Sequence, residues 1–186
     1  MATTEIQELE QQILEMKKQL AELKRAQPAT RAADYGFDGL DGPVKLSDLF
    51  QGKSDLVLIC NMGRSCRHCT LWADGFNGVV PELESRAGFA LISADGIEDL
   101  RKFAVKRGWR FRVASDRDGK FRRDMGFAGA NGDPWPGVIG FRKNEDGTID
   151  RIASAELGEG DDFCPTWHMF DLLANGWNGW EPQYRL

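Results

Sequence analysis

The sequence predicts an α/β fold with a mixed central sheet and a helical arm at its N-terminus. Short apolar runs of strand length alternate with amphipathic segments of helical period, which is typical of successive β-α-β units. Two later runs, 137–141 and 149–153, are separated by a polar loop and predict an antiparallel hairpin that closes the sheet. At 186 residues the chain can bury a sizeable core without help from disulfides.

Residues 1–27 predict one amphipathic helix, which Pro28 ends. Its apolar residues recur at alternating spacings of three and four, the a/d pattern of a coiled coil; they are Ile6, Leu9, Ile13, Met16, Leu20 and Leu23. Isolated helices of this length are marginal in water, so something must cover the stripe. Either the helix packs on its own domain or it pairs with a second copy, and we favour a homodimer.

Residues 28–44 combine Gly and Pro with small polar residues, which predicts a linker with turns ahead of a domain at 45–186. In that domain we expect a short helical turn at 46–50, strands at 56–60, 89–93 and 111–115, and helices beginning at Cys66 and covering 97–107 and 165–174.

Composition limits the class of function. The net charge of −5 argues against nucleic acid or an anionic membrane as the principal partner. The longest strongly apolar run, 56–60, is far too short to cross a bilayer, and the N-terminal residues lack the apolar core of a secretory signal. Four cysteines in such a chain indicate the reducing cytoplasm, where a Cys-x-x-Cys pair is catalytic or binds a metal.

The chemistry is expected at Cys66-Arg67-His68-Cys69, between a buried strand and a helix. The first amides of that helix and its dipole stabilise a thiolate at Cys66. Positive charge on Arg64, Arg67 and protonated His68 would act in the same direction. Cys69 lies one helical turn further on, where it can close the disulfide that releases a substrate. This chemistry needs no cofactor.

Several motifs resemble known proteins. The segment LSDLFQGK, the strands LVLIC and FALIS, the Cys-x-x-Cys pair and SDRDG are similar to the peroxiredoxin and thioredoxin-like layout. More narrowly, CRHCTLWADGFNG and TWHMFDLLANGWNGWEP resemble a family of uncharacterised bacterial proteins described as predicted dithiol–disulfide oxidoreductases.

The resemblance implies a three-layer thioredoxin-like fold and a thiol–disulfide oxidoreductase acting on a protein or small-molecule disulfide or thiol. Cys66 would be the nucleophile and Cys69 the resolving thiol. Pro136 corresponds to the proline that thioredoxin-like proteins keep in cis opposite their cysteines, with Pro134 as the competing candidate.

An alternative function is metal binding. Cys164 and His168 would complete, with Cys66 and Cys69, a set of three thiols and one imidazole that suits zinc. This alternative requires a fold that brings the two distant halves together.

A further alternative is a thiol peroxidase. There a peroxide oxidises Cys66 to a sulfenic acid, and Cys69 condenses with it to form a disulfide. Such a site needs an arginine and a hydroxyl near the thiolate, for which Arg64, Ser65 and Thr70 are the candidates. A dimeric scaffold with incidental thiols is the remaining possibility.

Overall fold

A computed structural model describes residues 2–183 of the chain. Its eight strands form one sheet in the order β1-β8-β7-β4-β5-β6-β2-β3. The strands are β1 (Thr30–Ala32), β2 (Gly36–Gly39), β3 (Gly42–Lys45), β4 (Asp55–Asn61), β5 (Gly88–Ser93), β6 (Arg112–Ser115), β7 (Gly137–Lys143) and β8 (Ile149–Glu156). The helices are α1 (Ala2–Ala26), the 3-10 helix η1 (Leu46–Phe50), α2 (Arg67–Arg86), α3 (Ile97–Arg107), α4 (Lys120–Asp124) and α5 (Pro165–Phe170).

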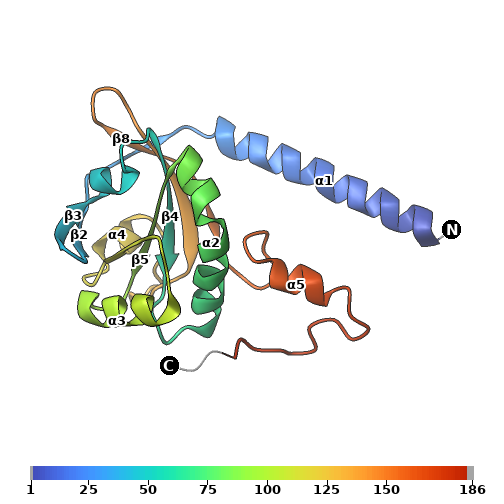
Figure 1. Cartoon of the computed structure of the whole chain (residues 1–186). Helices are drawn as coiled ribbons and strands as arrows, with labels where there is room; N and C mark the ends of the chain where they lie inside the picture. Colours follow the sequence, from blue (N-terminus) through green and yellow to red (C-terminus); the bar gives the residue numbers. More distant parts are fainter. Residues whose placement is uncertain (1, 184–186) are drawn as a thin grey trace.

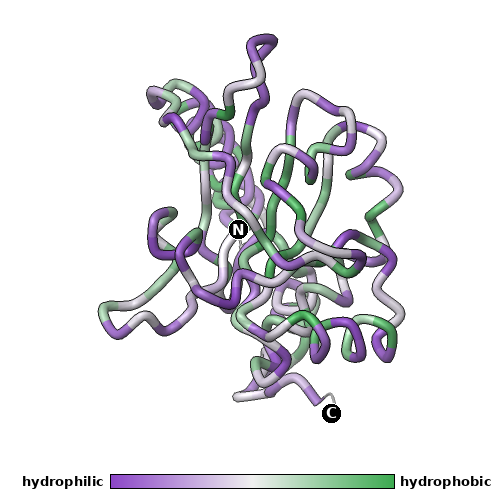
Figure 2. The backbone as a smooth tube through the Cα atoms, turned by 90° about the vertical axis from the view of Figure 1, so that its left-hand side faces the viewer, coloured by the Kyte–Doolittle hydropathy of each residue, from purple (hydrophilic) through white to green (hydrophobic). Residues whose placement is uncertain are grey.

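The middle of the sheet confirms the predicted α/β pattern. Strands β4, β5 and β6 run parallel, whereas β7 pairs antiparallel with β4 and with β8. All six residues of β5 are buried, because helices or loops cover this strand on both faces. Figure 2 shows these central strands as the apolar interior of the molecule.

Alternate side chains of β4 enter two separate cores, which makes the fold three-layered. Leu58 and Cys60 pack on one face with residues of η1 and α4. Ile59 points to the other face, where α2, α3 and Trp167 of α5 cover the sheet. Helix α2 therefore has a buried apolar side and holds its first turn against the carboxyl end of β4 (Figure 1).

Residues 28–44 differ from the predicted linker, because they contain three strands. Strand β1 pairs with β8, and β2 pairs with both β3 and β6. Phe37 of β2 is buried and packs edge-on against Phe121 of α4, with ring centroids 5.3 Å apart. The glycines and the proline that suggest turns lie in β2 and β3, which are four residues each, and β3 forms one edge of the sheet.

Several element boundaries also differ from the predictions by a few residues, and one helix is additional. The third parallel strand begins at Arg112, one residue later than expected, and α5 ends at Phe170. The short helix α4 was not predicted, because five residues give too little periodicity to recognise.

Helix α1 confirms the predicted helical arm, and it projects away from the sheet (Figure 1). Its apolar stripe is largely exposed, from 48% at Ile13 to 66% at Leu23. One ion pair ties the arm to the C-terminal part of the chain, between Lys17 Nζ and Asp162 Oδ1 at 2.5 Å. The stripe is thus not covered by the described part of its own chain. In residues 2–183, no helix is long and apolar enough to cross a membrane.

Candidate functional site

The loop between β4 and α2 is held by side-chain hydrogen bonds to its backbone. Asn61, buried at the end of β4, accepts from the Gly63 amide at 2.7 Å and donates to the Cys69 carbonyl at 3.3 Å. Gly63 has φ of 113°, a left-handed conformation that favours glycine. A Cβ there would lie only 3.1 Å from the Asp95 carboxylate. These constraints fix where Cys66 enters the helix.

Cys66 is the N-cap residue of α2, as its position in the sequence predicts. Its Sγ accepts a hydrogen bond from the Cys69 amide at 3.1 Å. Donation by the Cys69 thiol lowers the pKa of Cys66 to about 7, helped by the amides of Cys69 and His68 and opposed by partial burial. The Cys69 thiol therefore contributes most to stabilising the thiolate, and the amides of the first turn of α2 add to it.

Cys69 differs from Cys66 in both its exposure and the direction of its pKa shift. It is buried, with an exposed fraction of 3%, and the pKa of its thiol is raised by its hydrogen bond to Cys66, by burial and by the charge on Cys66. The pair thus consists of one accessible thiolate and one protected thiol beneath it.

The basic neighbours of Cys66 lie in different surroundings. Arg64 Nη1 pairs with Asp99 Oδ1 at 2.8 Å. Arg67 is exposed at the mouth of the site. His68 lies between the two cysteines in the sequence, and its side chain is half-buried.

An open cleft of about 690 Å³ contains the Cys66 side chain. It is lined by Met62, Ser65, Cys66, Arg67, His68, Asp133, Pro134 and Glu181. No peptide bond among residues 2–183 is cis, so the cis bond expected at Pro136 is wrong. Pro134, the competing candidate, lies in the cleft wall beside Cys66, whereas Pro136 directly precedes β7.

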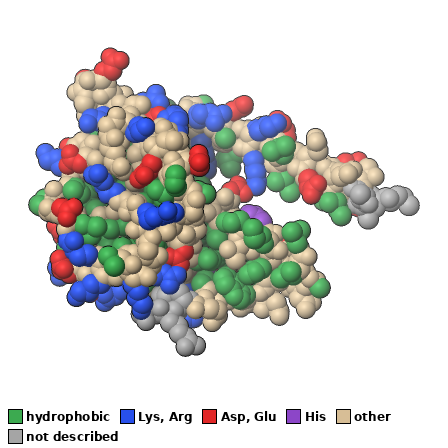
Figure 3. Space-filling model, in the orientation of Figure 1, with side chains coloured by type: hydrophobic (Ala, Val, Ile, Leu, Met, Phe, Trp, Pro, Cys, Tyr) green, Lys and Arg blue, Asp and Glu red, His purple; other side chains and the backbone are tan. Residues whose placement is uncertain are grey.

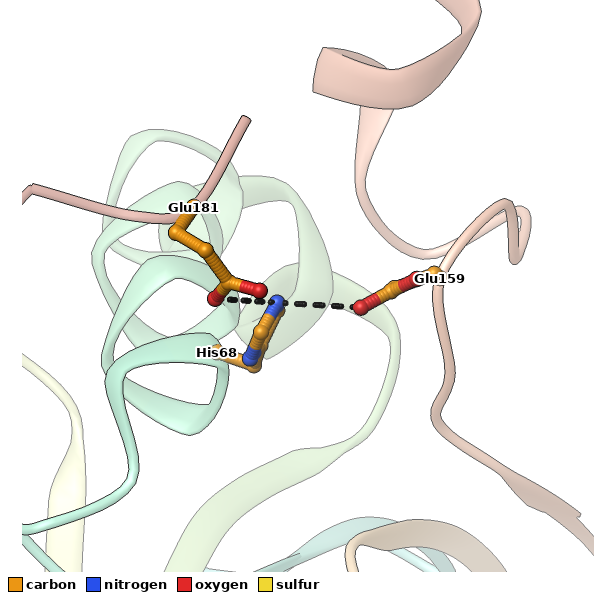
Figure 4. A group of neighbouring side chains, drawn as sticks. All are labelled: His68, Glu159 and Glu181. Atoms are coloured by element: carbon orange, nitrogen blue, oxygen red, sulfur yellow. Dashed lines mark ion pairs between the residues drawn. The ribbon is translucent and has the colours of Figure 1, made fainter. Parts of the chain in front are cut away.

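His68 faces two carboxylates from the far end of the chain (Figure 4). Its Nε2 lies 3.3 Å from Glu159 Oε1 and 3.6 Å from Glu181 Oε2. The ring also packs at about 6 Å against Trp72 of α2 and Trp167 of α5, which are stacked nearly parallel on each other. The first turn of α2 is therefore in contact with the C-terminal segment.

Cys164 and His168 lie apart from this cleft. Cys164 is buried and its Sγ contacts Thr166 Oγ1 at 3.4 Å. His168 Nε2 is 3.1 Å from the Asp161 carbonyl oxygen, on an exposed side chain.

The four ligands of the predicted zinc site are not brought together. Among residues 2–183, only His68, Glu159 and Glu181 form a group of potential ligands whose atoms all lie within 4.8 Å of one another. The thiol-rich site of the metal alternative is therefore absent from the described part of the chain.

Several residues of the site were missed from the sequence. Asn61 is the last residue of β4 and Asp95 follows β5, and no motif distinguishes either from an ordinary residue at the end of a strand. Glu159 and Glu181 reach His68 from about ninety or more residues away, so no local spacing could reveal them. The one sequence feature that pointed to this part of the chain is the motif TWHMFDLLANGWNGWEP, which contains Glu181.

The chain belongs to a known family. A family model described as "Bacterial protein of unknown function (DUF899)" matches residues 2–184. No curated protein matches the chain.

Solved structures share the fold. Peroxidoxin BcpB from Mycobacterium tuberculosis is 25% identical, with a TM-score of 0.56 over 69% of this chain and 84% of that one. Peroxiredoxin Q from Xanthomonas campestris is 18% identical, with a TM-score of 0.58 over 72% and 87%. The mitochondrial 2-Cys peroxiredoxin from Plasmodium falciparum is 16% identical, with a TM-score of 0.55 over 69% and 82%. The fold is thus thioredoxin-like, and the similarity to the peroxidoxin supports a redox function of that general kind.

Proposed function

We propose that this DUF899 protein is a thiol–disulfide oxidoreductase in which Cys66 is the nucleophile and Cys69 the resolving thiol. The observation that carries the proposal is the geometry of the pair. Cys66 Sγ lies in an open cleft and accepts the Cys69 amide at 3.1 Å, while the Cys69 side chain is buried behind it. This arrangement supplies an attacking thiolate and a second thiol within one helical turn.

The reaction proceeds through one mixed disulfide. The Cys66 thiolate attacks one sulfur of a substrate disulfide, a new sulfur–sulfur bond forms, and the other substrate sulfur leaves as a thiolate that takes up a proton. Cys69 then loses its proton and attacks Cys66 Sγ, which releases the second substrate thiol. The substrate gains two electrons and the protein ends with a Cys66–Cys69 disulfide; the reverse sequence oxidises a dithiol.

The volume and the charges of the cleft limit which substrates can reach Cys66. A volume of about 690 Å³ fits a small-molecule disulfide or an exposed loop of a protein. Arg67 and the carboxylates of Asp133 and Glu181 give its rim both signs of charge. Both classes therefore remain in the proposal.

The test is turnover of insulin disulfides and of a small aromatic disulfide in the presence of an external thiol reductant. Cys66→Ser should reduce turnover to the uncatalysed rate. In a separate reaction without the reductant, Cys69→Ser should release one substrate thiol per chain and then accumulate a mixed disulfide, visible by mass spectrometry. Cys164→Ala, which removes a buried thiol outside the cleft, is the matched control and should turn over like the wild type. Wild-type turnover in both single variants would contradict the dithiol mechanism.

A second candidate is thiol peroxidase activity, which the similarity to a peroxidoxin favours. The Cys66 thiolate would take one oxygen from a peroxide and release an alcohol or water; the resulting sulfenic acid would condense with Cys69 and release water. Of the expected helpers, Arg64 pairs with Asp99, and the Thr70 hydroxyl donates to the Cys66 carbonyl at 3.1 Å. Ser65 lines the cleft. Consumption of peroxide that exceeds disulfide turnover in the wild type would favour this function.

We also propose that α1 joins two copies of the chain. Its a/d stripe is self-complementary, and the exposed fractions of Ile6, Met16 and Leu23 exceed one half. Figure 3 shows apolar side chains gathered along the arm. Burial of each large apolar residue against a partner would contribute about 1.5–3 kcal/mol of transfer free energy.

A further inference from the structure

Three segments that are distant in sequence converge beside the Cys66 cleft. His68 comes from the first turn of α2, Glu159 from the turn after β8, and Glu181 from the C-terminal segment (Figure 4). The carboxylates approach the imidazole from two sides. This convergence is tertiary, which distinguishes it from a run of acidic residues on one helix or loop.

Two carboxylates share one ring nitrogen of His68. The Nε2 atom of His68 holds at most one hydrogen, yet carboxylate oxygens approach it at 3.3 Å and 3.6 Å. Both separations are longer than the usual N–H···O hydrogen bond of about 2.7–3.2 Å. Glu159 and Glu181 also bring two like charges within 4.8 Å of each other.

The same separations fit a cation. Two N or O donors that each lie about 2.0–2.2 Å from a tetrahedral zinc ion are about 3.3–3.6 Å apart. The measured distances from His68 Nε2 to Glu159 and Glu181 fall in this range. A divalent ion would also balance the two carboxylate charges.

We propose that His68, Glu159 and Glu181 form a binding site for a divalent transition metal of the zinc type. One imidazole and two carboxylates are a ligand set that such ions accept, and three protein ligands leave a position for water or substrate. His68 and Glu181 also line the cleft that contains Cys66. The ion would tie the C-terminal segment to the first turn of α2 at the mouth of the cleft.

The experiment measures zinc binding to full-length protein after removal of metals with a chelator. All measurements use protein that carries Cys66→Ser and Cys69→Ser, because the free thiols of the pair could bind zinc themselves. This double variant is the background for the other substitutions. Isothermal titration should show one zinc ion per chain. In this background, Glu159→Gln and Glu181→Gln should each weaken binding by at least about tenfold, since even outer-shell partners of metal ligands contribute 10–100-fold.

Glu156→Gln is the matched control, because this exposed glutamate lies three residues before Glu159 and outside the cluster. It should bind zinc like the background. Equal affinity in all three Glu→Gln variants, or no binding in the Cys66→Ser/Cys69→Ser background, would overturn the proposal. Circular dichroism of each variant checks that the fold is kept. Because the assay contains no redox cysteines, its failure would leave the proposed oxidoreductase function untouched.

Discussion

Two cysteines of this protein occupy the same place in a helix but lie in contrasting surroundings. Cys66 is the N-cap of α2 and Cys164 the N-cap of α5, both with extended backbone conformations. The Cys66 thiol lines a cleft and accepts a backbone amide. The Cys164 thiol is buried, makes no capping hydrogen bond, and contacts Thr166.

The two N-caps differ in the hydrogen bonds around the sulfur and in the residues just before the helix. At α5, the Asp161 carboxylate accepts the amides of Phe163 and Cys164, at 2.7 Å and 3.1 Å. Pro165 then opens the helix without an N–H. At α2, the amides remain available to Cys66. The sulfur with the lowered pKa is thus the one that lines a cleft, where the Cys69 thiol and, to a smaller extent, the amides of Cys69 and His68 stabilise its thiolate.

The first prediction concerns a substitution that removes side-chain packing around Cys164. Trp167 is buried and stacks on Trp72, with centroids 6.1 Å apart. Trp167→Ala should lower the free energy of unfolding by about 3–5 kcal/mol in urea titrations, because it deletes a large core side chain. It should also make Cys164 accessible to iodoacetamide.

Trp177→Ala is the matched control, because Trp177 is 38% exposed. It should cost much less stability and leave Cys164 protected. If Trp167→Ala changes neither the stability nor the labelling of Cys164, then packing of the C-terminal segment is not what separates the two cysteines.

The second prediction concerns the arm and should leave the site unchanged. Deletion of residues 1–27 removes the exposed stripe of α1 and its ion pair with Asp162. Sedimentation or light scattering should then report a lower mass than for the full chain. Labelling of Cys66 should stay as in the wild type. An oligomeric state that survives the deletion would show that α1 does not join the copies.

The sequence could predict elements whose pattern is local. The runs LVLIC and FALIS lie in buried strands β4 and β5, because a strand covered on both faces must be continuously apolar. Cys66 caps the start of α2, and the change from strand to helical periodicity that predicts a helix there is visible in the sequence. The arm was equally visible as a helix, although its pattern does not show what covers it.

Features fixed by tertiary contacts could not be predicted. Strand β2 is short and rich in glycine, and its partners β3 and β6 define it as a strand. The protonation of Cys66 depends on the Cys69 thiol and on amides that only the folded turn orients. The carboxylates at His68 come from the other end of the chain.

The most direct test of the account is the pH dependence of alkylation of the reduced, metal-free protein, followed for each cysteine by peptide mass spectrometry. The pKa of Cys66 is lowered to about 7, so its labelling rate should rise through about that pH and level off before the ordinary thiol value of about 8.5. Burial raises the pKa of Cys60 to about 12, so Cys60 should stay unlabelled, as should buried Cys164. A midpoint for Cys66 at or above about 8.5, or labelling of Cys164 at the same rate, would contradict the central claim that the first turn of α2 creates an accessible thiolate.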